Sequence, residues 1–179
     1  DWFSGGLGAD TMAGGAGSDR WQADYSTVAS NVELTLLATG TATIAATGAN
    51  LIGIEAITLT TGAGADIINT EAYGADDTVY SGSGIDLVEL GRGVDLAHGG
   101  EDEDTLHMDW SAVTDPTLAI GHSYYTGGYY RYSNGEDQLD YQAFEKYHLE
   151  GGAGHDALYG AGLNDTLIGN AGNDLLAGG

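Results

Sequence analysis

Hydrophobic residues recur along the chain at a fixed distance from aspartate. In each of eleven segments an apolar residue stands two positions after an aspartate. The aspartates are Asp1, Asp10, Asp19, Asp66, Asp77, Asp86, Asp95, Asp104, Asp156, Asp165 and Asp174. The apolar residues are Phe3, Met12, Trp21, Ile68, Val79, Val88, Ala97, Leu106, Leu158, Leu167 and Leu176. Three residues whose middle side chain is apolar form the shortest strand that can turn one side chain inward and its neighbours outward. The pattern therefore predicts a short β-strand in each segment.

The aspartates belong to a nine-residue repeat that begins with glycine. Gly-Gly-Leu-Gly-Ala-Asp-Thr-Met-Ala starts at Gly5, and units of the same form start at Gly14 and Gly151. The six residues before each strand form a turn that needs positive φ angles and a close backbone approach, which glycine allows. Because one unit buries almost nothing alone, the units must stack on copies of themselves. Stacking would align the aspartates in rows about 4.8 Å apart, which is repulsive unless cations lie between them. Oxygen-only ligands in flexible turns select calcium over zinc or copper.

Composition agrees with a need for cations. The 179 residues include 27 acidic and 4 basic side chains, 31 glycines and no cysteine, for a formal net charge of −23. A chain this acidic with so few large apolar residues is expected to be disordered without a positively charged partner. The same charge argues against nucleic acid or an anionic membrane as a partner. The uncharged stretch Leu34 to Ile54 is rich in threonine and alternates as a strand does, so it predicts no membrane insertion.

The repeat resembles the RTX calcium-binding nonapeptide family, whose pattern is Gly-Gly-x-Gly-x-Asp-x-U-x. The resemblance implies an all-β fold, a parallel β-roll of RTX type with two short strands per turn. It also implies several calcium ions (Ca2+), on the order of four to eight, held between turns at both edges. The implied aspartate ligands are Asp10, Asp19, Asp66, Asp77, Asp86, Asp95, Asp104, Asp156, Asp165 and Asp174. The implied backbone ligands are Gly5, Gly14, Gly151, Gly160 and Gly169.

Several units depart from this pattern. The unit that ends at Tyr80 is two residues too long and carries Asp76-Asp77 where Gly-x-Asp is expected. Leu90 stands where its unit should begin with glycine, and Asp102 replaces a later glycine. Asn170 and Ala161 occupy the second position of two C-terminal units. We expect weaker calcium sites at these turns, with the turn before Asp77 the weakest.

The repeats form three blocks, at residues 1–22, 61–107 and 151–179, separated by longer β-strand insertions at 23–60 and 108–150. The insertions match each other. Asp24 and Asp109 each follow a repeat aspartate by five residues, and Glu55 and Glu145 each precede one by eleven. Asp24 and Asp109 are either additional calcium ligands or residues that hydrogen-bond the backbone at the end of a turn. Glu55 and Glu145 are either ligands or capping, solvated carboxylates.

The second insertion is rich in tyrosine. Residues 123–133 read as a β-hairpin with a two-glycine turn. One row of tyrosines could face solvent and contact a sugar, a cell-surface molecule or a second copy of the chain. The alternative is that the tyrosines form cross-strand pairs that stabilise the hairpin itself.

Catalytic motifs are missing from the sequence, and we expect no enzymatic activity. The triad, zincin and dinucleotide-binding patterns are all absent. His98 and His107 are nine residues apart, which places them on opposite faces of a roll and argues against a shared zinc ion.

Function follows from calcium-dependent folding. We expect an extracellular, calcium-binding structural segment of a secreted or cell-surface bacterial protein, such as a surface-layer protein, adhesin or scaffold. The RTX resemblance implies type I secretion, with calcium closing the roll only after export. The alternative is the calcium-folding region of a secreted toxin or hydrolase with its catalytic domain elsewhere. Since the repeat pattern runs into both ends of the chain, we expect a longer parent protein.

Overall fold

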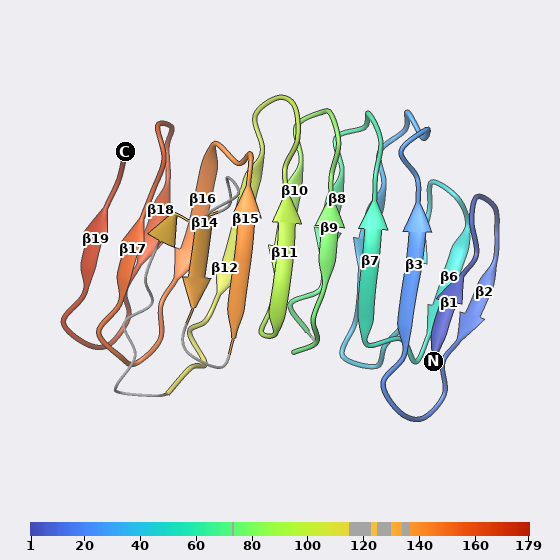
Figure 1. Cartoon of the computed structure of the whole chain (residues 1–179), viewed down its shortest axis with the longest axis horizontal. Coiled ribbons are helices and arrows are strands. Elements are labelled where there is room, and N and C mark those ends of the chain that lie inside the picture. The colour runs from blue at the N-terminus through green and yellow to red at the C-terminus, as the bar shows by residue number, and fades with distance from the viewer. Residues whose placement is uncertain (73, 115–122, 125–129, 134–136) are drawn as a thin grey trace.

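Two facing layers of β-strands form the molecule, each built mainly from one large sheet and continued at one end by a small one (Figure 1). The computed structural model describes residues 1–72, 74–114, 123–124, 130–133 and 137–179. Every regular element within those ranges is a β-strand, as the sequence predicts. In the same ranges no helix is long and apolar enough to span a membrane. The described chain starts at one end of the long axis and finishes at the other (Figure 1).

The larger sheet has eight strands and the smaller one has six. In spatial order, the eight-stranded sheet contains β1 (Trp2–Ser4), β3 (Arg20–Asp24), β7 (Ala56–Thr60), β9 (Thr78–Tyr80), β11 (Val94–His98), β15 (Gln138–Gln142), β14 (Tyr130–Ser133) and β13 (Ser123–Tyr124). The six-stranded sheet contains β18 (Thr166–Ile168), β16 (Lys146–Glu150), β12 (Thr105–Asp109), β10 (Leu87–Leu90), β8 (Ile67–Asn69) and β4 (Glu33–Thr35). Two smaller sheets contain β2 (Thr11–Ala13), β6 (Ala49–Ile52) and β5 (Ala42–Ile44), and β17 (Ala157–Tyr159) with β19 (Leu175–Ala177).

Consecutive repeat strands alternate between the two sheets, and neighbours within a sheet are parallel. β9 and β11 pair in the larger sheet, whereas β8, β10 and β12 pair in the smaller one. One full turn of the roll therefore takes two nine-residue units, and Asp86 meets Asp104 at a separation of 18 residues. The separation from Asp66 to Asp86 is 20 residues, because this turn of the roll includes the unit that is two residues too long. The predicted parallel β-roll is confirmed.

The apolar position of the repeat fills the space between the sheets. Val79, Val88, Ala97 and Leu106 are completely buried, and they form one continuous core with the apolar residues of both insertions. At the C-terminal end burial decreases, and Leu176 on β19 is 45% exposed. Each repeat thus depends on the next turn of the roll to cover its apolar side chain.

The two insertions add antiparallel strands to the roll. In the first insertion β5 and β6 are antiparallel, and β6 pairs in parallel with β2. In the second, β13 and β14 are antiparallel, which agrees with the predicted hairpin, although its turn at 125–129 lies outside the described residues. β14 then pairs antiparallel with β15 and takes the edge next to it. As a result, β17 and β19 pair with each other in a separate small sheet.

Both insertions begin in the same way, as the matching sequence frames predict. Tyr25 and Trp110 are both buried, and each backbone carbonyl accepts a hydrogen bond from a valine three residues later, Val28 or Val113. The carbonyls of those valines accept bonds from the backbone N–H groups of Ala63 and Ala153, at 3.1 and 3.0 Å. The insertions are thus anchored on the first turns of the repeat blocks that follow them.

Candidate metal sites

Repeat aspartates are linked into rows by hydrogen bonds at the edge where the chain enters each sheet. At the entrance to the six-stranded sheet, the N–H of Asp66 donates to Oδ1 of Asp86 at 2.7 Å, and the N–H of Asp86 donates to Oδ1 of Asp104 at 2.9 Å. The N–H of Val32 donates in the same way to Oδ1 of Asp66. Each carboxylate thus accepts a bond from the preceding turn of the roll. We call this row the six-strand ladder: Asp66, Asp86, Asp104, Glu145 and Asp165.

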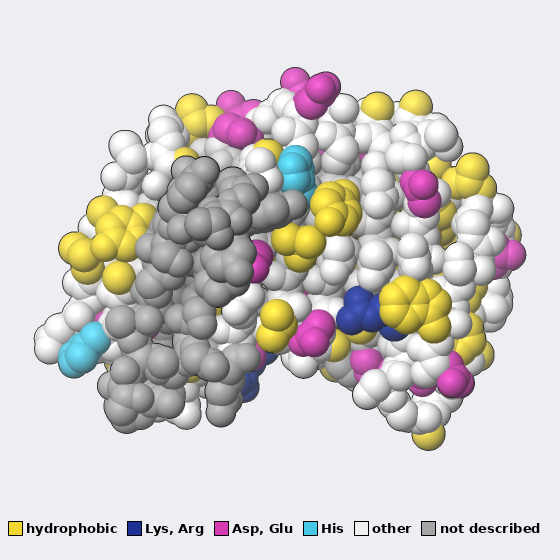
Figure 2. All heavy atoms as spheres, in the orientation of Figure 1, with side chains coloured by type: hydrophobic (Ala, Val, Ile, Leu, Met, Phe, Trp, Pro, Cys, Tyr) yellow, Lys and Arg dark blue, Asp and Glu magenta, His cyan; other side chains and the backbone are white. Residues whose placement is uncertain are grey.

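A second row, the eight-strand ladder, lies at the entrance to the larger sheet: Asp1, Asp19, Glu55, Asp77 and Asp95. The N–H of Asp77 donates to Oδ1 of Asp95 at 2.8 Å, and the backbone nitrogen of Asp1 donates to Oδ1 of Asp19 at 2.6 Å. The predicted alignment of aspartates along both edges is therefore present. Most aspartates of the two ladders are buried, so the acidic side chains visible at the upper and lower edges in the space-filling view are mainly exposed ones outside the ladders (Figure 2).

Glutamates replace aspartate where each ladder passes an insertion. The N–H of Asp19 donates to Oε2 of Glu55 at 2.8 Å, and the N–H of Asp104 donates to Oε2 of Glu145 at 3.0 Å. At both places one carbonyl accepts two N–H groups: those of Glu55 and Ala56 donate to Asp19, and those of Glu145 and Lys146 donate to Asp104. The strand register is unbroken there, since Ala56 pairs with Arg20 and Lys146 with Thr105, so each glutamate holds the position of a ladder aspartate. Glu55 and Glu145 thus accept ladder hydrogen bonds, and their role as calcium ligands stays a prediction.

The second carboxylate oxygen of several ladder aspartates has no protein donor. Oδ2 of Asp19, Asp66, Asp86 and Asp104 is buried and, among the described residues, without a hydrogen-bond partner. An ionised carboxylate buried in this way is unfavourable unless a cation or a proton neutralises it. Oxygen ligands in these turns are the type that Ca²⁺ prefers. The donor set therefore fits calcium.

The raised pKa values of the ladder aspartates also indicate that the folded state needs bound cations. Burial raises the pKa of Asp95 to about 8 and that of Asp104 to about 7, and neighbouring carboxylates add to the shift. Burial also raises the pKa of Asp77 and Asp86 to about 6. The ladder hydrogen bonds act in the opposite direction but do not cancel the effect of burial. Without bound cations, Asp95 would hold a proton at neutral pH, and Asp104 would hold one for part of the time.

The first glycine of a unit lies against the carboxylate of the same unit. A Cβ added to Gly151 would overlap Oδ2 of Asp156, and Gly160 and Gly169 are placed in the same way against Asp165 and Asp174. At Gly5 the corresponding distance to Oδ2 of Asp10 is 3.0 Å. The close approach of this glycine brings its backbone beside the carboxylate, as a shared ligand set requires.

Positive φ angles occur at the second and fourth positions of most turns. Gly82 and Gly84 have φ of 93° and 123°. Asp102 (87°) and Asn170 (61°), the residues that depart from the glycine pattern, take the same left-handed conformation; aspartate and asparagine tolerate it better than most residues. Gly62 has no positive φ, because its turn packs against the carbonyl of Val28 in the preceding insertion. The expectation of positive φ in every turn is wrong there, and it is also wrong in the turns before Asp156 and Asp165.

The remaining predicted ligands are spread between the ladders and the surface. Asp10, Asp165 and Asp174 are half-buried near the ends of the roll. Asp24 and Asp109 are exposed, and each Oδ1 accepts the N–H of the serine two residues later, at 3.0 and 2.8 Å. Hydrogen bonds from that serine hold the pKa of Asp24 below its usual value. Both residues thus make the turn contact of the backbone alternative, and their role as ligands stays a prediction.

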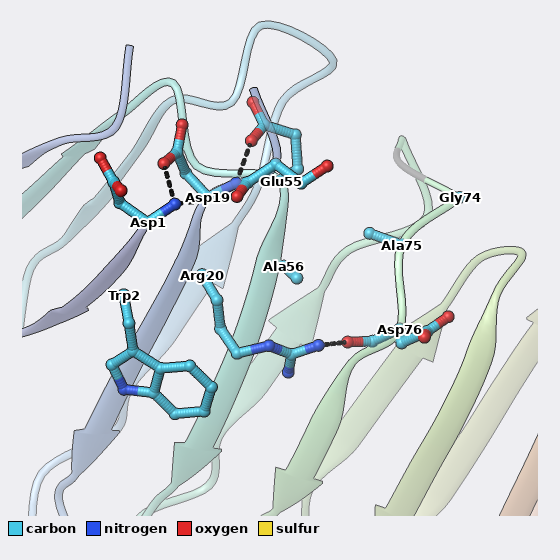
Figure 3. Close-up of a pocket in the computed structure, with 10 residues that line it drawn as sticks. Asp1, Trp2, Asp19, Arg20, Glu55, Ala56, Gly74, Ala75 and Asp76 are labelled. Atoms are coloured by element: carbon cyan, nitrogen blue, oxygen red, sulfur yellow. Dashed lines mark hydrogen bonds and ion pairs between the residues drawn. The ribbon is translucent and has the colours of Figure 1, made fainter. Parts of the chain in front are cut away.

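An open pocket of about 460 Å³ lies where the eight-strand ladder passes the first insertion (Figure 3). Arg20 crosses this pocket, and its guanidinium donates to the carbonyl of Ile57 and to Oγ1 of Thr58, each at 3.1 Å, and to the carbonyl of Asp76. Figure 3 shows the guanidinium pointing away from the carboxylates of Asp19 and Glu55. Arg20 thus joins neighbouring turns of the roll and pairs with neither of those carboxylates.

Sequence reasoning missed two features. Asp137 is buried in the second insertion, where it accepts the N–H of Gly93 at 3.1 Å and pairs with Arg92 at 2.8 Å. Nothing in the repeat pattern marks this residue.

His98 and His107 lie on different sheets, as predicted, but His107 lies directly beside His148. Counting from the ladder residues would have found this pair, because each histidine follows its ladder carboxylate, Asp104 or Glu145, by three residues.

The glycine contacts give a first test. Substituting alanine for Gly151 is expected to lower the stability of the calcium-loaded chain by about 1–3 kcal/mol, because the new Cβ overlaps the Asp156 carboxylate. A Cβ at Gly162, in the same block, would meet nothing within 4 Å, so Gly162→Ala is the matched control, with an expected change within about 0.5 kcal/mol. Thermal unfolding in saturating calcium measures both, and equal losses would contradict this description of the turn.

Comparison with protein families gives a match that covers more than half of the chain. The model for the RTX calcium-binding nonapeptide repeat matches in four copies, at residues 1–20, 58–88, 71–106 and 150–179. All four copies lie mainly in the repeat blocks, and between them lies most of each insertion. Comparisons with curated proteins and with solved structures give no match.

Proposed function

The chain belongs to the RTX calcium-binding nonapeptide repeat family, and on this premise we propose that it is a calcium-folded structural segment of a secreted or cell-surface bacterial protein. The observation that carries the proposal is the row of buried, unpartnered Oδ2 atoms at Asp66, Asp86 and Asp104. A fold that buries these oxygens is incomplete without a counter-charge. Calcium bound only by the folded state adds its binding free energy to the stability of the roll.

The residues that would hold calcium are the ladder carboxylates together with the backbone of the first glycine in each turn. When bound, the ion supplies positive charge that keeps neighbouring carboxylates ionised at close range. The chain's own part is to align the carboxylates, because every Oδ1 bond between turns fixes the orientation of the next carboxyl group. Binding at one turn therefore favours binding at the next, and folding should be cooperative.

We propose a scaffold role, as part of a surface-layer protein or adhesin, with no catalysis in this chain. Support comes from the continuous core, which joins the three repeat blocks and both insertions into one long roll. Contact with a second copy of the chain or with a cell-surface glycan through residues 123–133 belongs to the same proposal. The described part of that segment is the backbone pairing of β13 and β14.

Secretion through a channel requires an unfolded chain, so we expect the roll to fold only in the calcium outside the cell. At the submicromolar calcium of a bacterial cytoplasm, the acidic chain would stay unfolded and fit for type I secretion, whereas extracellular millimolar calcium would close the roll. Limited proteolysis tests this: at submicromolar calcium we expect cleavage throughout the chain, and at millimolar calcium we expect resistance from both sheets. Equal resistance in both conditions would overturn folding after export.

A further inference from the structure

A second group of possible metal ligands lies away from the calcium turns, on the outer face of the six-stranded sheet. Glu89 on β10, His107 on β12 and His148 on β16 are aligned in register on three neighbouring strands. Their neighbours Val88, Leu106 and Leu149 are fully buried, so the alternation of the strands places the three polar side chains on the outside. Glu150, two residues after His148, lies on the same face.

The orientation of His107 is fixed by carboxylates. Its Nδ1 lies 3.1 Å from Oε1 of Glu89 and 3.0 Å from Oε1 of Glu71. The hydrogen-bond geometry is met with Glu89, whereas Oε1 of Glu71 remains without a partner. A proton at Nδ1 leaves Nε2 of His107 with a free lone pair.

The ring of His107 lies against a second histidine, His148. The ring centroids of His107 and His148 are 4.5 Å apart. Nε2 of each ring is buried and has no hydrogen-bond partner among the described residues. Nε2 of His148 lies 3.3 Å from Oε1 of Glu150, and one ligand atom each from His107, His148 and Glu150 lie within 4.8 Å of one another.

We propose that His107, His148 and Glu150 bind a transition-metal ion of the zinc type, separate from the calcium sites. Two imidazole nitrogens and one carboxylate suit Zn²⁺, while Ca²⁺ and Mg²⁺ prefer oxygen. Three protein ligands leave a fourth position for water. The contact from Nδ1 of His107 to Glu89 is the outer-shell arrangement that fixes the ring of a metal-binding histidine and makes it more basic.

Such an ion would join the two ends of the second insertion. His107 lies on the strand that precedes this insertion, and His148 and Glu150 lie on the strand that ends it. Because the ligands are far apart in sequence, the site exists only when the roll is formed. The inference therefore rests on the proposed calcium-dependent folding, and zinc would add stability after calcium has closed the roll.

Cobalt is a suitable probe, because tetrahedral Co²⁺ absorbs visible light where Zn²⁺ is silent. With the roll saturated in calcium, we expect one equivalent of Co²⁺ to give the tetrahedral spectrum and Zn²⁺ to displace it. His148→Ala is expected to lower Co²⁺ affinity at least ~10-fold, and Glu89→Gln by ~10–100-fold. The matched control is His98→Ala, which removes a histidine from the opposite sheet and should leave the affinity unchanged.

Circular dichroism on the same samples separates the two proposals. A chain that is folded in calcium but gives no tetrahedral cobalt spectrum overturns the zinc-type site alone. The zinc-type site is also overturned if the His148→Ala variant still gives the cobalt spectrum, or if the His98→Ala variant loses it. A chain that folds in chelator and still binds Co²⁺ through His148 contradicts calcium-driven folding and leaves the metal site standing.

Discussion

Replacing both Asp86 and Asp104 with asparagine is expected to raise the calcium concentration needed for folding at least ~10-fold, since calcium affinity depends on the number of charged ligands. Asparagine keeps an oxygen where Oδ1 accepts the N–H of the preceding turn. It removes the negative charge at the buried Oδ2 atoms. The double variant thus retains the ladder hydrogen bonds and loses part of the calcium site.

In chelator the same substitution should stabilise the folded state instead of destabilising it. Burial and neighbouring carboxylates raise the pKa of both aspartates, which shows that their ionised forms are unfavourable in the calcium-free roll. The double variant should therefore be more stable than the unmodified chain in chelator at pH 8, and less stable in saturating calcium. Far-ultraviolet circular dichroism in chelator, where the variant should hold more β-structure than the unmodified chain, and urea unfolding in saturating calcium together measure this reversal.

The control for this reversal is Asp24→Asn with Asp109→Asn, which changes two exposed carboxylates that hydrogen-bond only their own turns. It removes the same formal charge from the chain and should produce no reversal. If the control and the ladder variant behave alike, net charge and not the buried ladder governs folding.

Acid should substitute in part for calcium. The pKa of Asp95 is raised to about 8, that of Asp104 to about 7, and those of Asp77 and Asp86 to about 6, whereas an unfolded chain has aspartate pKa values near 4. The folded state therefore binds more protons than the unfolded state between about pH 4 and pH 8. By linkage, the stability of the calcium-free roll falls as pH rises through this window.

The expected result is a gain of β-structure in chelator as the pH is lowered from 8 toward 5, with the steepest change in stability below pH 6, where all four aspartates contribute. Each group contributes a slope of up to about 1.4 kcal/mol per pH unit between its unfolded and folded pKa. In saturating calcium the dependence should be much weaker, because the ions hold the carboxylates in the charged form. A calcium-free chain that becomes more stable as pH rises would contradict the assignment.

The repeat made the fold predictable from sequence to an unusual extent. A fixed distance from each aspartate to an apolar residue was enough to place a strand, a turn and a ladder carboxylate in nearly every unit. Stacking then determines the neighbours, because residues 18 apart must meet in a roll with two strands per turn. Phe3, Leu167 and Leu176 are the exceptions in burial, since they lie in the end turns of the described roll.

The insertions limit what the sequence reveals. Glu55 and Glu145 hold ladder positions because the strand register of Ala56 with Arg20 and of Lys146 with Thr105 continues into the turn, and no repeat aspartate marks either position in the sequence. Asp137 reaches the entrance of the larger sheet from a segment without repeats. The pairing of His107 with His148 depends on the register of β12 and β16, which becomes visible once Glu145 is recognised as a ladder residue.

The central claim is that calcium completes the fold, and far-ultraviolet circular dichroism during a calcium titration tests it most directly. With the chain in chelator at pH 8, we predict the spectrum of an unfolded chain. Added calcium should produce a cooperative transition to β-structure between submillimolar and millimolar concentrations, whereas magnesium should not. A full β-spectrum in chelator, unchanged by calcium, would mean that the buried ladders are stable without ions and would contradict the account.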